Sequence, residues 1–378
     1  MRNLKIGLTG ILLMLWTALA LAQASTSKPT LTFELLPVLK EFTVLGLNAD
    51  GTVLVGAVMQ ERDTRSQAFR WNGQGVPERL GCQPGICESV AKAVSANGKV
   101  VVVQGTDSAD KTHVFLWKEG NAELEEVTPQ QGGFFAEAIN ADGSIVVGGS
   151  GERQEQGSEV AFVWNRQKGW KALPSPSEYN SVTSWVTATS ISENGQTIEG
   201  LVSFPLQSDQ SQFPESVKTR WVDGQNTGVE LPSVSPSASE NTIPRVLLTE
   251  AQIAEKFARH DLFDPELPEA GAHGVPIDWE STDGKLILGH QIAGGSSMIW
   301  TQANGICKFK DWFNLLGLNV TADERFKGVR ASDDGRVLIG EQRDEEGANV
   351  PWRLRADQAL SSITVSDKPY CGAALARE

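Results

Sequence analysis

Short runs of β-branched and aliphatic residues recur along the chain, and each run follows a polar turn that ends in glycine. The turn reads Asn or Ser, then any residue, then Asp or Asn, and finally Gly. Its six copies begin at Asn48, Ser95, Asn140, Ser192, Ser281 and Ser332. A second glycine follows the first by five positions in every copy but one, which has Val103 there. Each unit then reaches a tryptophan at the end of an apolar stretch, at Trp71, Trp117, Trp164, Trp221, Trp300 and Trp352. The chain therefore repeats one structural unit.

The apolar runs predict β-strands joined by tight turns. An Asp-Gly or Asn-Gly pair supplies the positive φ values of a type I′ hairpin turn, and the flanking runs have the length and alternation of strands. Each unit is expected to hold four strands, in the third unit at Glu137–Asn140, Ser144–Gly149, Val160–Trp164 and Trp170–Leu173. One such sheet cannot bury both of its faces, so the copies must stack. A period near 45–50 residues with four strands per unit is typical of a β-propeller blade.

The spacing of the turns predicts six blades, with seven as the alternative. Successive turn glycines lie 47, 45, 52, 89 and 51 residues apart, so one interval exceeds the others by about 40 residues. Within it, Thr249–Asp261 has helical apolar spacing and neither a turn glycine nor a closing tryptophan. We therefore expect a partly helical insertion at about 232–274 in a single propeller domain spanning 31–371. The segment Leu31–Leu36 is too short for a blade and would supply the outer strand of the last one.

The repeat resembles a known family. The turn Asn140-Ala-Asp-Gly, the run Ile145-Val-Val-Gly and the strand Ala161-Phe-Val-Trp164 are similar to the HAF-type extracellular repeats of bacterial exported proteins. The stretch Phe309–Gly335, with a short helix at Asp311-Trp-Phe-Asn-Leu-Leu, is similar to the last repeats of that family. The resemblance covers roughly residues 44–355 and implies a propeller-like fold and export. It assigns no catalytic residues.

The first 24 residues have the order of a secretory signal. Arg2 and Lys5 precede an apolar run from Ile6 to Leu21, and Ala-x-Ala sequences follow at 20–24. The run is shorter than the roughly 20 residues of a membrane span. We predict a signal peptide over 1–24 and an exported mature chain, periplasmic or secreted, with no later membrane span. An uncleaved anchor helix is the alternative.

Cysteine use agrees with export. Four cysteines in an exported chain suggest two disulfides. Cys82 and Cys87 flank a Pro-Gly loop and would form a local bridge, which leaves Cys307 to pair with Cys371. Four cysteines allow three connectivities, and the sequence does not choose among them. A zinc site is the alternative, although the chain has neither a C-x-x-C pair nor a histidine near the cysteines.

Charge and composition exclude several classes of function. The chain has 47 Asp and Glu against 33 Lys and Arg, and this net charge of −14 argues against a nucleic-acid partner. No G-x-S-x-G, H-E-x-x-H, phosphate-loop or dinucleotide-binding motif occurs. The turn carboxylates, densest at Asp333 and Asp334, are of the type that binds calcium, but each turn offers only one or two of them. We therefore expect no cofactor.

Candidate ligand contacts lie outside the repeated positions. The six repeat tryptophans are expected to pack between blades. Trp170, Trp185, Trp279 and Trp312 fall outside that register, and we predict Trp185 and Trp279 as binding residues, with packing as the alternative for each. In the insertion, His260, Asp261, Asp264 and His273 form an acidic, histidine-containing group and complete the candidate site.

These observations favour a non-enzymatic exported scaffold that binds a protein or glycan through loops on one face. Turns and packing account for the repeated residues, so variation is left to the loops and the insertion. The alternative is a hydrolase or lyase of an extracellular polymer, with acidic residues at the centre of the propeller. Propellers host both classes, so the fold does not decide between them.

Overall fold

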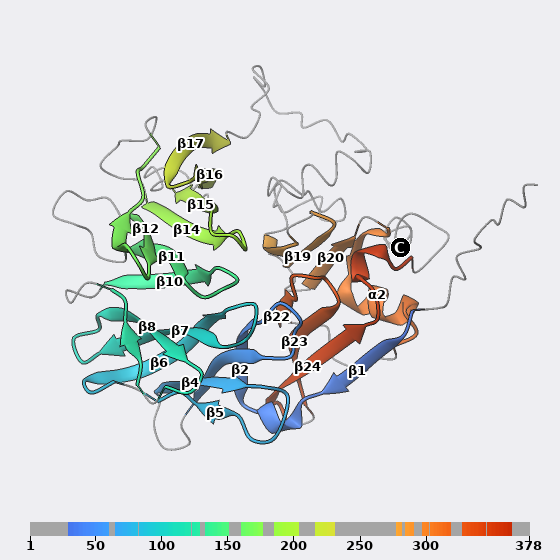
Figure 1. Cartoon of the computed structure of the whole chain (residues 1–378). Helices are drawn as coiled ribbons and strands as arrows, with labels where there is room; N and C mark the ends of the chain where they lie inside the picture. Colours follow the sequence, from blue (N-terminus) through green and yellow to red (C-terminus); the bar gives the residue numbers. More distant parts are fainter. Residues whose placement is uncertain are drawn as a thin grey trace, which may run out of the picture.

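The chain forms a β-propeller of six four-stranded antiparallel blades. The computed structural model describes residues 29–59, 65–81, 83–121, 123–128, 133–150, 160–176, 185–203, 216–230, 277–281, 284–290, 297–301, 303–318, 327–344 and 346–364. These residues fold into six sheets, arranged in a ring (Figure 1). The predicted fold class and the six-blade count are therefore confirmed. The insertion at 232–274 lies outside the described residues.

Each of the first five blades is built from four strands that follow one another in the chain. Blade 1 contains β2 (Phe42–Leu47), β3 (Leu54–Met59), β4 (Ser66–Trp71) and β5 (Glu78–Arg79). Blade 2 contains β6 (Ile86–Val94), β7 (Val100–Asp107), β8 (Thr112–Lys118) and β9 (Glu125–Glu126), and blade 3 contains β10 (Phe134–Ile139), β11 (Ile145–Ser150), β12 (Ala161–Asn165) and β13 (Gly169–Ala172). Blade 4 contains β14 (Trp185–Ile191), β15 (Thr197–Ser203), β16 (Ser216–Val222) and β17 (Gln225–Glu230), and blade 5 contains β18 (Ile277–Glu280), β19 (Leu286–His290), β20 (Ser297–Thr301) and β21 (Gly305–Lys308).

The sixth blade is completed by the N-terminal strand. It contains β22 (Lys327–Ala331), β23 (Val337–Arg343) and β24 (Asn349–Ala356), and β1 (Leu31–Leu35) pairs antiparallel with β24 as the outer strand. Figure 1 shows β1 in blue beside β24 in red. The expectation that this segment closes the ring is confirmed.

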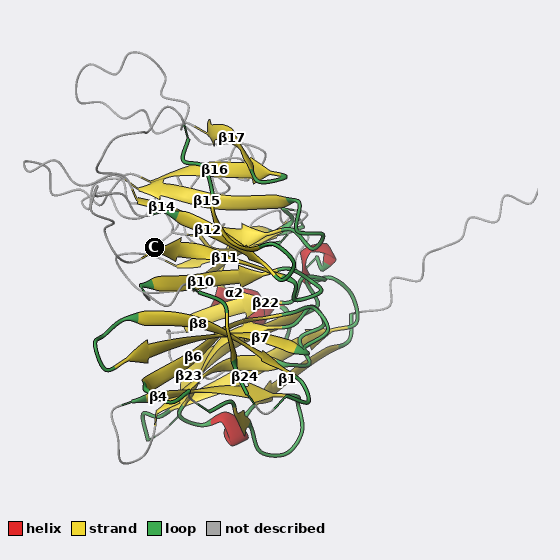
Figure 2. Cartoon of the chain, turned by 60° about the vertical axis from the view of Figure 1, so that its left-hand side comes forward, coloured by secondary structure: helices red, strands yellow, loops and turns green. Residues whose placement is uncertain are grey.

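Helices are few in the described part of the chain (Figure 2). The helix α2 (Phe309–Leu315) follows blade 5 where the sequence predicted it, and two short 3-10 helices, η1 (Pro37–Leu39) and η3 (Leu360–Ser362), lie near the closure. None of the helices in these residues is long and apolar enough to cross a membrane.

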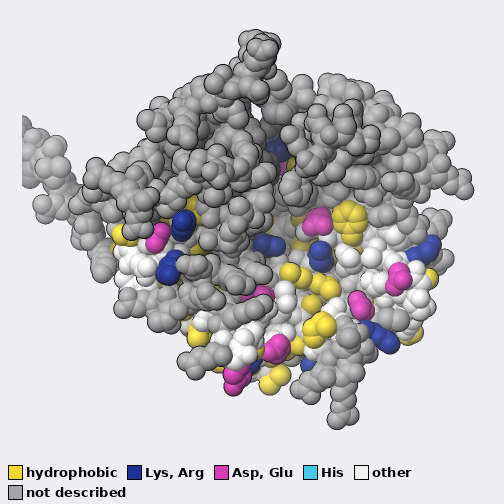
Figure 3. All heavy atoms as spheres, turned by 180° about the vertical axis from the view of Figure 1, so that it is seen from behind, with side chains coloured by type: hydrophobic (Ala, Val, Ile, Leu, Met, Phe, Trp, Pro, Cys, Tyr) yellow, Lys and Arg dark blue, Asp and Glu magenta, His cyan; other side chains and the backbone are white. Residues whose placement is uncertain are grey.

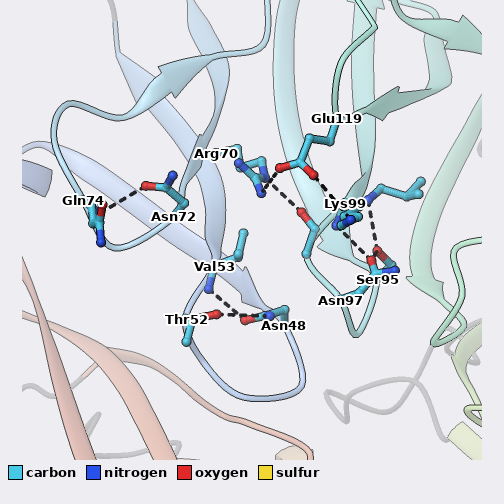
Figure 4. A network of polar contacts seen from close by, with 12 residues as sticks. Asn48, Thr52, Val53, Arg70, Asn72, Gln74, Ser95, Asn97, Lys99 and Glu119 are labelled. Atoms are coloured by element: carbon cyan, nitrogen blue, oxygen red, sulfur yellow. Dashed lines mark hydrogen bonds and ion pairs between the residues drawn. The ribbon is translucent and has the colours of Figure 1, made fainter.

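The repeated turns are held by their own side chains. In each copy the first residue's side-chain oxygen accepts a hydrogen bond from the backbone N–H five residues on, as in Val53 N–H to Asn48 Oδ1 at 2.8 Å (Figure 4). The turn Asp or Asn accepts from the N–H two residues on, as in Ser144 N–H to Asp142 Oδ1 at 2.8 Å. These bonds explain the Asn/Ser and Asp/Asn preferences, and they hold the pKa of Asp142 below its usual range.

The type I′ expectation is wrong in its detail. Each turn glycine has a positive φ, between 63° and 75°, but none of the Asp or Asn residues described in the turns does. The glycine N–H instead donates to the carbonyl of the first turn residue, as Gly51 does to Asn48 at 2.9 Å. The loop is therefore a four-residue turn that ends in a left-handed glycine, which explains why only glycine is invariant within it.

Neighbouring blades pack through apolar faces. The repeat tryptophans are 0–8% exposed, and those of blades 1 to 4 lie in clusters shared with the preceding blade, as Trp117 does with Val53 and Val55. Cation–π contacts stabilise two of these junctions. Arg70 Cζ lies 5.1 Å from the centroid of the Trp117 ring, and Arg353 Cζ lies 5.5 Å from that of the Trp71 ring. The predicted packing between blades is confirmed for the tryptophans of blades 1 to 4.

Trp352 is buried, but it does not occupy the position of the other five. Trp71 pairs across the sheet with Leu54, three residues after the turn glycine, whereas Trp352 pairs with Gly340, the second glycine of its unit. Leu354 takes the repeat-tryptophan position in blade 6. The sequence alignment of this last unit was therefore wrong by two residues. The Trp352 ring packs instead against Phe33 of β1 and Phe313 of α2, with ring centroids 5.8 Å and 5.5 Å away.

The junction between blades 4 and 5 differs from the others. In the described structure, clusters of buried apolar residues join each of the remaining five pairs of neighbouring blades. The residue four positions after the turn glycine faces the next blade in these clusters, at Val55, Val102, Val147, Leu288 and Ile339. In blade 4 this position is Glu199, which pairs with Arg220 at 2.7 Å while both side chains stay about half exposed. This face of blade 4 is therefore polar.

Candidate functional site

Two of the six predicted ligand contacts lie on described strands. His260, Asp261, Asp264 and His273 lie outside the described residues. Trp185 begins β14 and Trp279 lies in β18, so both occur on the first strands of neighbouring blades, but the structure describes only their backbones. The proposed roles of these six residues remain predictions.

Two other tryptophans outside the repeat register serve packing. Trp312 of α2 is fully buried beside Phe309 and Phe313, and Trp170 of β13 packs edge-on against Phe134 at 5.5 Å. For these two, the packing alternative is confirmed.

One predicted cysteine is placed. Cys307 of β21 is buried and disulfide-bonded. Cys82 and Cys371 lie outside the described residues, and the side chain of Cys87 is not described. Which cysteines pair therefore remains a prediction.

The first strands of the blades surround the centre of the ring. They form one edge of every sheet, and β2 contacts both β22 and β6, β10 contacts both β6 and β14, and β18 contacts β22. Each first strand is paired along one edge with the second strand of its blade, so its unpaired edge faces the centre. Side chains that leave these strands toward the centre form the natural candidate site.

A β-bulge interrupts each of these inner strands near the turn. In blades 1 to 5 the strand pairing skips one residue, three positions before the turn begins. The skipped residues, which we call the bulge ring, are Leu45, Lys92, Glu137, Thr189 and Asp278. In blade 6 the pairing skips two residues, between Lys327 and Arg330. A bulged residue is left out of the strand pairing, although the Thr189 hydroxyl donates to Glu199 O of β15 at 3.4 Å, and bulges commonly redirect a side chain at a functional site.

Burial shows that the bulge redirects these side chains away from the packed faces. The preceding residues, Val44, Ala91, Ala136 and Ala188, are at most 3% exposed. The bulged Leu45, Lys92 and Glu137 are only partly buried, and Thr189 is exposed. The side chain of Asp278 is outside the described set. The described side chains of the bulge ring thus lie outside the packed faces between the blades.

The centre contains charges of both signs. Burial raises the pKa of Glu137, and attraction from Lys92 of blade 2 and Arg330 of blade 6 lowers it only in part. Blade 6 lies across the ring from blade 3, so these side chains affect one another across the centre. Seen from behind, the middle of the molecule shows basic, acidic and hydrophobic side chains together (Figure 3).

The turns form a second ring beside the bulge ring. In blades 2 to 4 backbone bonds join the second turn residues, from Ala96 N–H to Ala141 O at 3.0 Å and from Ala141 N–H to Glu193 O at 3.3 Å. Asp333 occupies this position in blade 6. The protein around it removes hydration and raises the pKa of Asp333, and the nearby carboxylates of Glu193 and Asp334 raise it further. One side of this turn end is therefore acidic.

The sequence contained a signal for the bulge ring that the repeat analysis missed. The position four before each turn is Val, Ala, Ala, Ala, Ile and Gly, whereas the next position is Leu, Lys, Glu, Thr, Asp and Val. In blades 1 to 5 an apolar residue thus precedes a chemically varied one, whereas the corresponding Val329 of blade 6 is buried in the core. Apolar periodicity does not reveal this varied position, because the bulge breaks the alternation of the strand.

His113, on the outer part of blade 2, forms a second polar cluster. Its Nδ1 lies 2.8 Å from Glu126 Oε1, and its Nε2 lies 3.2 Å from Asp107 Oδ2. Each ring nitrogen faces a different carboxylate, so the three groups do not converge on one point. The described residues contain no group of three or more His, Cys, Asp or Glu side chains suited to a metal ion. This cluster joins β8 to β9 and to the 107–111 turn.

Replacing His113 by glutamine is expected to lower stability much more in acid than in alkaline solution. Burial by itself would lower the pKa of His113, but the bonds to Glu126 and Asp107 outweigh it and raise that pKa. The charged histidine therefore stabilises the fold fully below its unfolded pKa near 6.5, and this contribution is lost as pH rises through the higher folded value.

Urea unfolding at pH 5.5 and pH 9 measures this difference. The variant should lose about 1–2 kcal/mol relative to the native chain at pH 5.5 and much less at pH 9. Asp107 also accepts from the N–H groups of Ala109 and Lys111, so its turn should persist in the variant. Equal losses at both pH values would show that packing, not charge, carries the effect.

Comparison with known proteins supports no closer assignment. No family model matches the chain, and no curated protein matches its sequence. Similar solved structures include TolB from Acinetobacter baumannii (12% identity, TM-score 0.41, 82% of this chain and 65% of that one). They also include a TolB structure from Agrobacterium tumefaciens (15% identity, TM-score 0.36, 49% of this chain and 62% of that one). A third is the β-propeller domain of the trilobed protease from Pyrococcus furiosus (8% identity, TM-score 0.42, 82% of this chain and 81% of that one). The chain spans less than two thirds of either TolB structure, and at these identities the likeness concerns the fold alone.

Proposed function

We propose that this chain is an exported, non-enzymatic propeller scaffold that binds a protein or glycan partner at the turn end of the ring. The observation that carries the proposal is the bulge ring. Turn bonds and packing account for the repeated residues, but they do not account for Lys92, Glu137 and Thr189, which face the centre. A rigid frame that presents varied side chains is the usual arrangement of a binding scaffold.

Export is part of the same proposal. It rests on the signal-like residues 1–24, on the cysteines and on the resemblance to extracellular repeats. The periplasm and the extracellular medium both fit these features.

Photo-crosslinking in the producing cell tests the binding proposal. A photoreactive residue would replace Thr189, which is exposed in the bulge ring, and, as a control, Val76. Val76 is 86% exposed in the β4–β5 hairpin, near the outer edge of blade 1. We expect an adduct of defined mass from position 189 that disappears when Lys92 and Arg330 are both changed to alanine. Equal labelling from both positions, or none from position 189, would refute the proposal.

A polymer hydrolase or lyase is the second candidate, and the charged centre supports it. Burial raises the pKa values of Glu137 and Asp333, and general acid catalysis uses carboxyl groups whose pKa is raised. Incubating the protein with peptidoglycan, chitin and soluble polysaccharides, with assay of released reducing ends and unsaturated products, separates the two candidates. Products that disappear in a Glu137→Gln variant, but not in a Glu123→Gln control, would establish the enzyme.

A further inference from the structure

We infer that the centre of the ring binds a polypeptide segment with positive and negative side chains close together, rather than a polymer of one charge. This inference deepens the proposed function and rests on it. It identifies the partner class that the charges of the bulge ring and the turn end fit.

The first argument is that opposite charges face the centre without pairing. Lys92, Glu137 and Arg330 come from three different blades, and no ion pair within 4.0 Å joins them in the described structure. Yet Lys92 and Arg330 are near enough to affect the ionisation of Glu137. Elsewhere in the described fold, partly buried charges do pair, as Arg353 does with Glu34 at 2.7 Å. The central charges are thus held apart by the ring.

The second argument is energetic. A partly buried charge without an ion pair has lost hydration that is not fully replaced, which costs free energy in the unbound protein. Arg330 recovers part of this cost, because its Nη1 donates to Val329 O at 3.3 Å. A ligand that places a cation beside Glu137 and an anion beside Lys92 or Arg330 restores those interactions. A ligand whose charges all have one sign is attracted either by Glu137 or by Lys92 and Arg330, and it is repelled by the other.

The third argument is the asymmetry of the turn end. The second turn residues of blades 1 to 3 are Ala49, Ala96 and Ala141, whose short side chains leave that side of the rim neutral. Glu193 of blade 4 and Asp333 of blade 6 make the other side acidic. A positive group is therefore favoured at the acidic rim, and a negative group is favoured deeper, beside Lys92 and Arg330.

The inner strands themselves favour a polypeptide. They are sheet edges, so backbone N–H and C=O groups border the centre and can bond an extended chain. Leu45 and Thr189 supply an apolar and a hydroxyl contact in the same ring. Polypeptides commonly carry both charges within a few residues, whereas charged polysaccharides mostly carry one sign.

Fluorescent capped peptides test this inference. The probes contain Lys-Ala-Glu, Glu-Ala-Lys, Lys-Ala-Lys, Glu-Ala-Glu or Gln-Ala-Gln, and binding to the full exported chain is followed by fluorescence anisotropy at low and physiological salt. We expect at least one mixed-charge probe to bind about tenfold more tightly than the single-charge probes. Glu137→Lys should shift the preference to the acidic probe, and Lys92→Glu should shift it to the basic probe.

Two variants serve as controls of equal charge change. Lys99, whose side chain is 63% exposed, and Glu123, which is also exposed, lie away from the bulge ring. Lys99→Glu and Glu123→Lys should leave the preference unchanged. If position 189 still forms its adduct in cells but the five probes bind alike, or the adduct is a glycan, this inference fails while the proposed function stands. If no adduct forms, the proposed function fails as well.

Discussion

Replacing Trp352 by alanine is expected to lower the free energy of unfolding by about 4 kcal/mol. The side chain is fully buried where three separate parts of the chain meet: blade 6, the closing strand β1 and the helix α2. Its ring packs against Phe33 and Phe313, and Gly340 leaves the space that it fills, because a Cβ there would lie 2.4 Å from Trp352 Cζ2. Truncation therefore leaves a cavity that the rigid sheet cannot close.

Equilibrium urea unfolding followed by circular dichroism measures this loss. Trp170→Ala is the matched control, because Trp170 is only partly buried and lies on an outer strand. We expect the control to lose about half as much, or less. Equal losses would mean that burial at the closure does not govern stability.

Changing Gly148 to alanine is expected to cost about 3 kcal/mol or more, although it adds a single methyl group. The added Cβ would lie 2.0 Å from the backbone oxygen of Phe135 and 2.9 Å from Ala136 Cα. The bulged strand β10 brings this carbonyl against β11, and backbone cannot move aside as a flexible side chain would. The second glycine of the repeat thus belongs to the same construction as the bulge.

A control with glycine strain but no overlap isolates this effect. Gly169 has a φ of +73° and no atom near its missing Cβ, so Gly169→Ala should cost only about 1 kcal/mol. Adding Phe162→Leu to Gly148→Ala should not restore stability, because the overlap is with backbone. Restoration by that second change would show that the Phe162 ring, not the carbonyl, sets the limit.

Local chemistry explains which parts of the fold could be predicted. The turns are made by side chains within six consecutive residues, so Asn140 and Asp142 reveal them in the sequence. Blade count and closure followed from the spacing of such turns and from the length of Leu31–Leu36. The alignment of Trp352 was wrong because apolar runs tolerate a two-residue shift, which preserves the face of the strand.

The centre of the ring could not be predicted in the same way. Lys92, Glu137 and Arg330 are far apart in the sequence and are ordinary surface residues in isolation. Only the ring brings them together, and only the bulge turns Lys92 and Glu137 toward its centre. The sequence features that pointed to chemistry were the unrepeated tryptophans, the turn carboxylates and the acidic, histidine-containing insertion, and none of these includes the charged residues of the inner strands.

The closure by β1 has a consequence for the rate and order of folding. Glu34 and Arg353 bond to each other although they are 319 residues apart in the sequence. A contact of this kind requires a large loop-closure entropy before it yields any stabilisation, and such contacts slow folding. Blades 1 to 5 have only local pairings and can form while β24 still presents an unpaired edge. During that interval the β1 of a second molecule can compete for the same edge, so the concentration of the protein during folding should govern the yield of closed monomeric rings.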